Sequence, residues 1–171
     1  MKVLFAIASD RFMDEEYTVP KKILTEAGIT CVTASTRKGI CSGMHGELVE
    51  PDLTIDEVNP ADYDGLVIAS GIGCQDELWR NEKLIDIANV MGNAGKVTAA
   101  ISLSPVILAE AGLLAGKKAT TFNTPACKRI FDLDKVELVD EKVVTSGKVV
   151  TAKSMFDAKA FGTAILAALQ N

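Results

Sequence analysis

Residues 99–112 read Ala99-Ala100-Ile101-Ser102-Leu103-Ser104-Pro105-Val106-Ile107-Leu108-Ala109-Glu110-Ala111-Gly112. The start of this stretch ends an apolar run that is typical of a buried strand. Pro105 fits the first turn of a helix, where its missing N–H is not needed. Ser102 is therefore expected in a sharp turn between a strand and a helix. A side chain at such a turn is held exposed, so its identity determines the chemistry available there.

The same alternation of apolar strands and amphipathic helices continues on both sides of this turn. The predicted strands cover residues 2–8, 29–34, 65–69, 96–101 and 118–122, and the predicted helices cover residues 13–27, 52–58, 81–94, 105–115 and 156–170. Residues 142–145 and 149–151 flank Ser146-Gly147-Lys148 and predict an antiparallel hairpin. This order indicates an α/β fold with a mostly parallel sheet and helices on both faces. Because no repeat or linker interrupts the 171 residues, we expect a single domain over residues 1–171.

Composition and charge exclude several classes of protein. The 18 basic and 23 acidic residues are interspersed and give a net charge of -5, without the basic stripe expected of a nucleic-acid-binding protein. No apolar segment approaches ~18 residues, so we expect no membrane span. The four cysteines, Cys31, Cys41, Cys74 and Cys127, lack the paired spacing of a zinc site. We therefore expect no metal or cofactor, free thiols and a cytoplasmic protein.

Three loops follow predicted strands at the edge where α/β sheets bind ligands, and they cover residues 9–16, 70–77 and 102–105. The first loop brings Glu16 and two other acids to the start of a helix, where acidic residues are common for structural reasons. The second loop contains Gly71 and Gly73. Their backbone amides are suited to an oxyanion, although glycines in such a turn also serve steric needs.

Several segments together resemble the ThiJ/PfpI family, most closely its PfpI-type intracellular proteases. They are Lys2-Val3-Leu4-Phe5, Gly43-Met44-His45-Gly46, Val58-Asn59-Pro60, Asn81-Glu82-Lys83 and Ala111-Gly112-Leu113-Leu114-Ala115-Gly116-Lys117-Lys118. The resemblance covers nearly the whole chain and implies a flavodoxin-like sandwich. It also implies a homodimer or hexamer, with His45 and residues 39–50 contributing to an interface. The activities attributed to the family are peptidase or amidase, deglycase, glyoxalase and chaperone.

The resemblance also assigns residues at the turn. Family members typically carry a cysteine there, within an Ile-Cys-His-Gly-Pro-like motif. In this chain Ser102 replaces the cysteine, Leu103 the histidine and Ser104 the glycine, whereas Pro105 is retained. Glu16 falls on the acidic position that hydrogen-bonds the family's thiol. The usual chemistry of the family is therefore altered at its centre.

Three further positions follow from the same resemblance. Gly71 falls in the oxyanion loop, where Ala69-Ser70-Gly71 replaces the usual Pro-Gly-Gly. Phe122 replaces a second histidine that some members use. The acid that a neighbouring subunit supplies in hexamers corresponds to Gln75 or Asp76.

Two functions from different classes remain open. A serine needs an adjacent base, and the single histidine, His45, does not align with the turn. The favoured hypothesis is a catalytically silent or altered member that binds a small polar or carbonyl metabolite. Its site would contain Ser102 and Glu16, surrounded by Gly71, Leu103, Ser104, Cys74, Asp76 and Phe122. The alternative is a hydrolase, an amidase or a deglycase or glyoxalase-type enzyme that uses Ser102 with Glu16, or a thiol relocated to Cys74 or Cys127.

Overall fold

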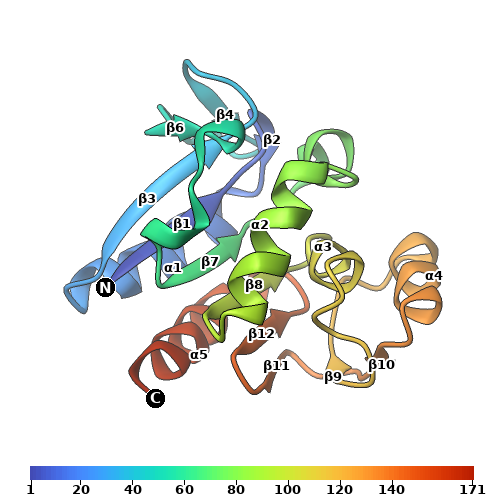
Figure 1. The fold of residues 1–171 in the computed structure, drawn as a ribbon. Helices are drawn as coiled ribbons and strands as arrows, with labels where there is room; N and C mark the ends of the chain where they lie inside the picture. The colour runs from blue at the N-terminus through green and yellow to red at the C-terminus, as the bar shows by residue number, and fades with distance from the viewer.

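A central seven-stranded sheet organises the protein, and a computed structural model describes all of residues 1–171 (Figure 1). Its strands are β1 (Lys2–Ala6), β3 (Thr30–Ser35), β6 (Leu53–Thr54), β7 (Gly65–Ile68), β8 (Val97–Ile101), β11 (Val143–Ser146) and β12 (Val149–Ala152). They lie in the order β11-β12-β8-β7-β1-β3-β6. Every neighbouring pair is parallel except β11 and β12, which form an antiparallel hairpin. The predicted mostly parallel sheet and its hairpin are thus confirmed.

Five α-helices and two small sheets surround the central sheet. The helices are α1 (Asp14–Glu26), α2 (Glu82–Asn93), α3 (Pro105–Glu110), α4 (Pro125–Leu133) and α5 (Ala158–Gln170). The small sheets contain β2 (Asp10–Phe12), β4 (Cys41–Gly43) and β5 (Leu48–Val49), and β9 (Lys118–Ala119) with β10 (Glu137–Leu138). Short helical turns are η1 (Ile55–Glu57), η2 (Pro60–Asp62), the π-helical η3 (Cys74–Leu78) and η4 (Met155–Asp157). No helix has both the length and the apolar character needed to cross a membrane.

The central strands are buried on both faces, and this explains their continuous apolar sequences. In β1, Val3 and Phe5 belong to the core layer that includes Phe161 of α5, whereas Leu4 and Ala6 belong to the layer under α2 and α3. Successive side chains of a strand point to opposite faces, so one apolar run supplies both layers. Figure 1 shows α1 and α5 side by side on one face of the sheet and α2 with α3 on the other.

The predicted helix over residues 52–58 is wrong. Leu53 and Thr54 form β6 at the edge of the central sheet, and only a single 3-10 turn follows. Asp52 fixes this segment, because its carboxylate accepts the Thr33 N–H at 2.8 Å and its own N–H donates to the Thr33 carbonyl. The acidic residue that suggested a helix start instead connects two strands.

Two boundaries and one unpredicted helix differ from the expectation between residues 105 and 133. The helix that begins at Pro105 ends at Glu110, before Gly112 with φ +79°. The predicted strand over residues 118–122 covers only Lys118–Ala119, which pair with β10 outside the central sheet. Helix α4 was not predicted, although Thr124 caps it by accepting the Cys127 N–H and Pro125 occupies its first turn.

Candidate ligand site beside Ser102

Ser102 lies directly after β8 and has the left-handed backbone conformation, with φ +64°. A non-glycine residue in this region is strained by about 1–3 kcal/mol, so the surrounding structure must hold it. Its N–H donates to the Ala152 carbonyl at 2.9 Å, and its carbonyl accepts the Phe122 N–H and the Thr121 hydroxyl, both at 2.8 Å. These contacts fix the sharp turn between strand and helix that the sequence predicts.

Ser104 stabilises the turn from inside the core. It is fully buried, and its hydroxyl oxygen lies 2.7 Å from both the Ile68 and the Ile101 carbonyl oxygens, which share its one proton, and accepts the Ile101 N–H at 2.9 Å. On the outer side of the turn, the Trp79 indole donates to the Leu103 carbonyl at 2.8 Å. Ser104 is therefore a structural residue of the turn, and the prediction that it contacts a ligand is not supported by its position.

Glu16 lies on the first helix with its side chain buried beside Ser102. Burial raises the pKa of the Glu16 carboxyl to about 8, against the opposing effects of hydrogen bonds from the Ser70 N–H and the Ser102 hydroxyl. The Ser70 N–H donates to Glu16 Oε2 at 2.9 Å. At neutral pH most of the protein therefore carries a protonated Glu16, which can donate a hydrogen bond and is not available as a base.

Gly71 brings the second loop, residues 70–77, against the first, residues 9–16. Its φ is +111°, and a Cβ at this position would lie 2.4 Å from the Arg11 carbonyl oxygen and 2.5 Å from the Met13 nitrogen. Only glycine permits this close approach of two backbones. The Gly71 N–H has no hydrogen-bond acceptor within the protein, and Gly71 lines the cavity described below.

The backbone amide of Leu103, which follows Ser102, already donates a hydrogen bond within the protein. The Leu103 N–H donates to the Ser70 hydroxyl at 3.0 Å. In sites of the nucleophile-elbow type, the amide after the nucleophile is one of the two that stabilise the oxyanion. Here the Ser70 hydroxyl already accepts a hydrogen bond from that donor.

A cavity of about 280 Å³ opens at these loops, and seven of its 11 lining residues are hydrophobic. The lining contains Ser102, Glu16, Gly71, Leu103 and Phe122 of the predicted site. It also contains residues that the sequence did not reveal: Met13, Met44, Ile72, Ser154, Met155 and Phe156. Residues 154–156 follow β12, and a strand end at the ligand-binding edge of the sheet was the available signal.

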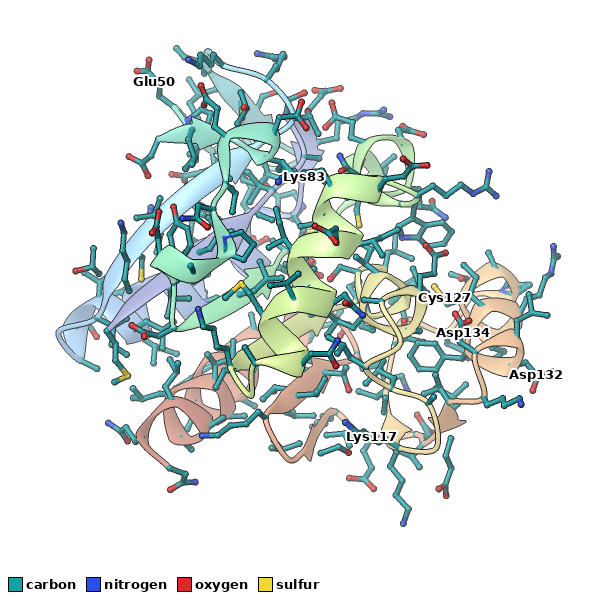
Figure 2. The ribbon with its side chains drawn as sticks, viewed as in Figure 1. Glu50, Lys83, Lys117, Cys127, Asp132 and Asp134 are labelled. Carbon is teal, nitrogen blue, oxygen red and sulfur yellow. The ribbon has the colours of Figure 1, made fainter.

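The remaining predicted residues lie outside this cavity. Cys74 is fully buried in the hydrophobic core, where burial raises the pKa of its thiol far above the usual range. Cys127 is equally buried, on the side of α4 that faces α3 (Figure 2). Asp76 is exposed and pairs with Arg11 at 2.9 Å. The geometry therefore gives no support to a relocated thiol, since neither sulfur reaches Ser102's cavity.

His45 also lies outside the cavity and does not provide a base for Ser102. Its side chain is 46 % exposed, and its Nδ1 is 2.9 Å from Glu15 Oε1, which raises the pKa of the imidazole. Asp14, Glu15 and His45 could together hold a metal ion, because their ligand atoms lie within 4.8 Å of one another. Both Asp14 oxygens, however, accept backbone N–H groups, from His45 and Glu47. The hydrogen bonds of this cluster therefore connect α1 to the segment that follows β4.

The chain resembles known proteins along nearly its whole length. A profile of the DJ-1/PfpI family matches residues 1–168. An uncharacterized protein of Methanocaldococcus jannaschii is 44% identical over 171 residues, which are 99% of this chain and 82% of that protein. A protein of Pyrococcus furiosus named deglycase PfpI is 38% identical over 153 residues, 90% of each chain. The crystal structure of a ThiJ/PfpI domain protein from Brachyspira murdochii superposes with a TM-score of 0.93 at 30% identity, covering 99% and 96% of the two chains. The chain therefore belongs to the DJ-1/PfpI family.

Proposed function

We propose that this protein binds a small neutral molecule in the Ser102 cavity, through a carbonyl oxygen flanked by apolar groups, without attacking it covalently. The observation that carries this proposal is the position of the buried Glu16 carboxyl, whose pKa burial raises to about 8, in an apolar cavity lining that contains no histidine. A neutral acid can donate a hydrogen bond to a carbonyl oxygen, whereas a carboxylate would repel it. The Gly71 N–H supplies a second donor.

Covalent attack by Ser102 meets two obstacles. The Ser102 hydroxyl is a weak nucleophile without a base, and Glu16 holds its proton at neutral pH. The negative oxygen of a tetrahedral intermediate would also lack the Leu103 N–H, which donates to Ser70. Loss of one such donor typically slows acyl transfer by about 10²–10³-fold.

A second candidate is an enzyme that acts on a carbonyl compound, because a relative in Pyrococcus furiosus is named a deglycase. The exposed strand-to-helix turn and the adjacent carboxyl group favour this candidate. Ionised Glu16 would accept the proton of Ser102 Oγ as the oxygen bonds to the carbonyl carbon. The electron pair of the C=O bond would move to oxygen, facing the Gly71 N–H.

The pH dependence distinguishes the two candidates. Binding by a protonated Glu16 weakens as the pH rises through about 8, whereas catalysis by an ionised Glu16 accelerates over the same interval. We would measure the affinity for benzamide, a neutral carbonyl probe, and for benzoate, its charged analogue. The proposal expects benzamide to bind more tightly, and Glu16→Gln to remove the pH dependence of its binding.

Two variants and one activity assay complete the test. Phe122→Ala should weaken benzamide binding because Phe122 lines the cavity, whereas Leu133→Ala, on the exposed side of α4, should not. Methylglyoxal consumption would be followed in parallel. A rate well above background that Ser102→Ala abolishes would refute the binding proposal and establish the second candidate.

We also propose that the protein forms a homo-oligomer. Phe156 and Ile72 line the same cavity and are 86% and 46% exposed, so a second subunit packed over this cavity would bury both apolar side chains. Sedimentation velocity measures the state directly, and a monomer at micromolar concentration would contradict this assignment.

A further inference from the structure

A second cleft, of about 340 Å³, lies beyond the Ser102 cavity and shares no lining residue with it. It opens where β9, β10 and β12 end: Thr120 follows β9, Asp140 lies just after β10, and Lys153 follows β12. All but two of its eight lining residues are polar. Ligands of α/β proteins bind at the carboxyl ends of strands, so this position suits a second binding site.

The cleft carries a positive charge within an acidic protein. Its charged residues are Lys128, Lys153 and Asp140, whereas the whole chain has a net charge of -5. Lys153 forms an ion pair with Asp140, but Lys128 has no acidic partner. The unpaired ammonium of Lys128 therefore leaves the cleft with one excess positive charge, which favours an anion.

Thr120 provides an independent indication of a ligand. It lines the cleft and is 1% exposed, and its hydroxyl has no hydrogen-bond partner in the protein. A buried hydroxyl without a partner destabilises a protein by about 1–3 kcal/mol. Such groups are rare and call for an explanation, commonly a bound water or ion.

We propose that this cleft binds the phosphate group of a small phosphate ester. Lys128, Lys153, Asn123 and the Thr120 hydroxyl offer donors from separate segments, an arrangement that suits a tetrahedral group with several acceptor oxygens. A planar carboxylate is matched best by the fork of an arginine, and the lining contains none. The volume is near the lower limit for ligand pockets, which restricts the ester to a few carbon atoms.

The test follows the amide NMR signals of the whole protein during titration with glycerol 3-phosphate, inorganic phosphate or glycerol at constant ionic strength. We expect saturable shifts at Thr121, Asn123 and Lys153 with the two phosphates and none with glycerol. Tighter binding of glycerol 3-phosphate identifies an ester as the ligand, whereas equal binding identifies free phosphate. Absence of saturable binding up to about 50 mM of either phosphate overturns the proposal, because a site of this kind should bind at least that well.

Two lysine variants distinguish a specific phosphate site from nonspecific electrostatic attraction of anions to the protein. Lys128→Ala should raise the Kd for glycerol 3-phosphate about tenfold or more, because a charge-assisted hydrogen bond is lost. Lys83→Ala is the matched control, since Lys83 is a helical lysine on α2, away from the cleft (Figure 2). Equal effects of the two variants would contradict the proposal.

Thr120→Val gives a sharper test because it affects binding and stability in opposite directions. Without ligand it should leave the Tm unchanged or raise it, since it removes an unpaired buried hydroxyl, yet it should raise the Kd about fivefold or more. Thr98→Val is its control: Thr98 is also buried and unpaired, but in β8 and outside the cleft. An unchanged Kd in the folded Thr120→Val variant refutes the role of this hydroxyl. If the Kd of Lys128→Ala is unchanged as well, the proposed site is refuted.

Discussion

Glu16→Gln is expected to remove most of the loss of stability that the protein suffers between pH 5 and 8. Glutamine keeps a side-chain oxygen for the Ser70 N–H, which donates to Glu16 at 2.9 Å, but it cannot ionise. The variant therefore preserves the shape and the main hydrogen bond of the site. The substitution removes the ionisable group, so the buried side chain at position 16 no longer binds or releases a proton.

The magnitude follows from the pKa of Glu16, which burial raises from 4.5 to about 8. Below pH 4.5 the carboxyl is protonated in both the folded and the unfolded chain, so it adds no pH dependence. Between pH 4.5 and 8 the unfolded chain releases the proton and the folded chain retains it. The free energy of unfolding therefore falls by about 1.4 kcal/mol per pH unit, which amounts to about 3 kcal/mol at pH 7 and at most about 5 kcal/mol above pH 8.

Urea unfolding at a series of pH values from 4.5 to 8.5 measures this difference. The free energies of wild type and Glu16→Gln should be similar near pH 4.5, and at pH 7 the variant should be more stable by up to about 3 kcal/mol. Glu50→Gln serves as the control, because Glu50 is an exposed carboxylate at the protein surface (Figure 2). Parallel curves for wild type and Glu16→Gln across this range would refute the reasoning, since they would mean that folding does not raise the pKa of Glu16.

Three further predictions concern the turn and the core. Gly71→Ala should destabilise the protein by about 2–4 kcal/mol in urea unfolding, because its Cβ would lie 2.4 Å from the Arg11 carbonyl oxygen at a φ of +111°; an unchanged midpoint would show that the two loops can separate at no cost. Ser102→Gly should be more stable than Ser102→Ala by about 1 kcal/mol, since both lack the hydroxyl and only glycine tolerates φ +64° without strain; equal Tm values would exclude strain at this residue. Phe161→Ala should cost about 3–5 kcal/mol and Phe156→Ala under about 0.5 kcal/mol, because the first ring is fully buried and the second is 86% exposed; similar losses would contradict this assignment of the core.

The fold was predictable where local sequence and burial agree. Continuous apolar runs such as residues 65–69 identify strands covered on both faces, and β7 occupies Gly65–Ile68. Prediction failed where a tertiary hydrogen bond decides the outcome. Asp52 resembles a helix start, yet its carboxylate accepts the Thr33 N–H from a strand 19 residues away. No local sequence pattern identifies Thr33 as the hydrogen-bond partner of Asp52.

The candidate site was predictable to the extent that strand ends define it. Glu16 lies in the first turn of α1, Gly71 follows β7 and Ser102 follows β8, and all three line one cavity. Cys74 lies in the π-helical turn η3 with its side chain in the core rather than in the cavity lining, and sequence periodicity does not reveal such a turn. Phe156 was missed because its segment becomes part of the site only through the position of β12 beside β8.

Ser70 joins the three loops and so determines which donors a ligand would meet. Its N–H donates to Glu16, its carbonyl accepts the Met13 N–H at 2.8 Å, and its hydroxyl accepts the Leu103 N–H. A glycine at this position would keep the two backbone contacts but would free the Leu103 amide for an oxyanion. The Ser70 hydroxyl therefore engages the Leu103 amide, and under the binding proposal the protonated Glu16 and the Gly71 N–H remain as the donors for a ligand beside Ser102. Under the binding proposal, the serine at position 70 matters as much as the serine at position 102, because one occupies an oxyanion donor and the other lacks a base.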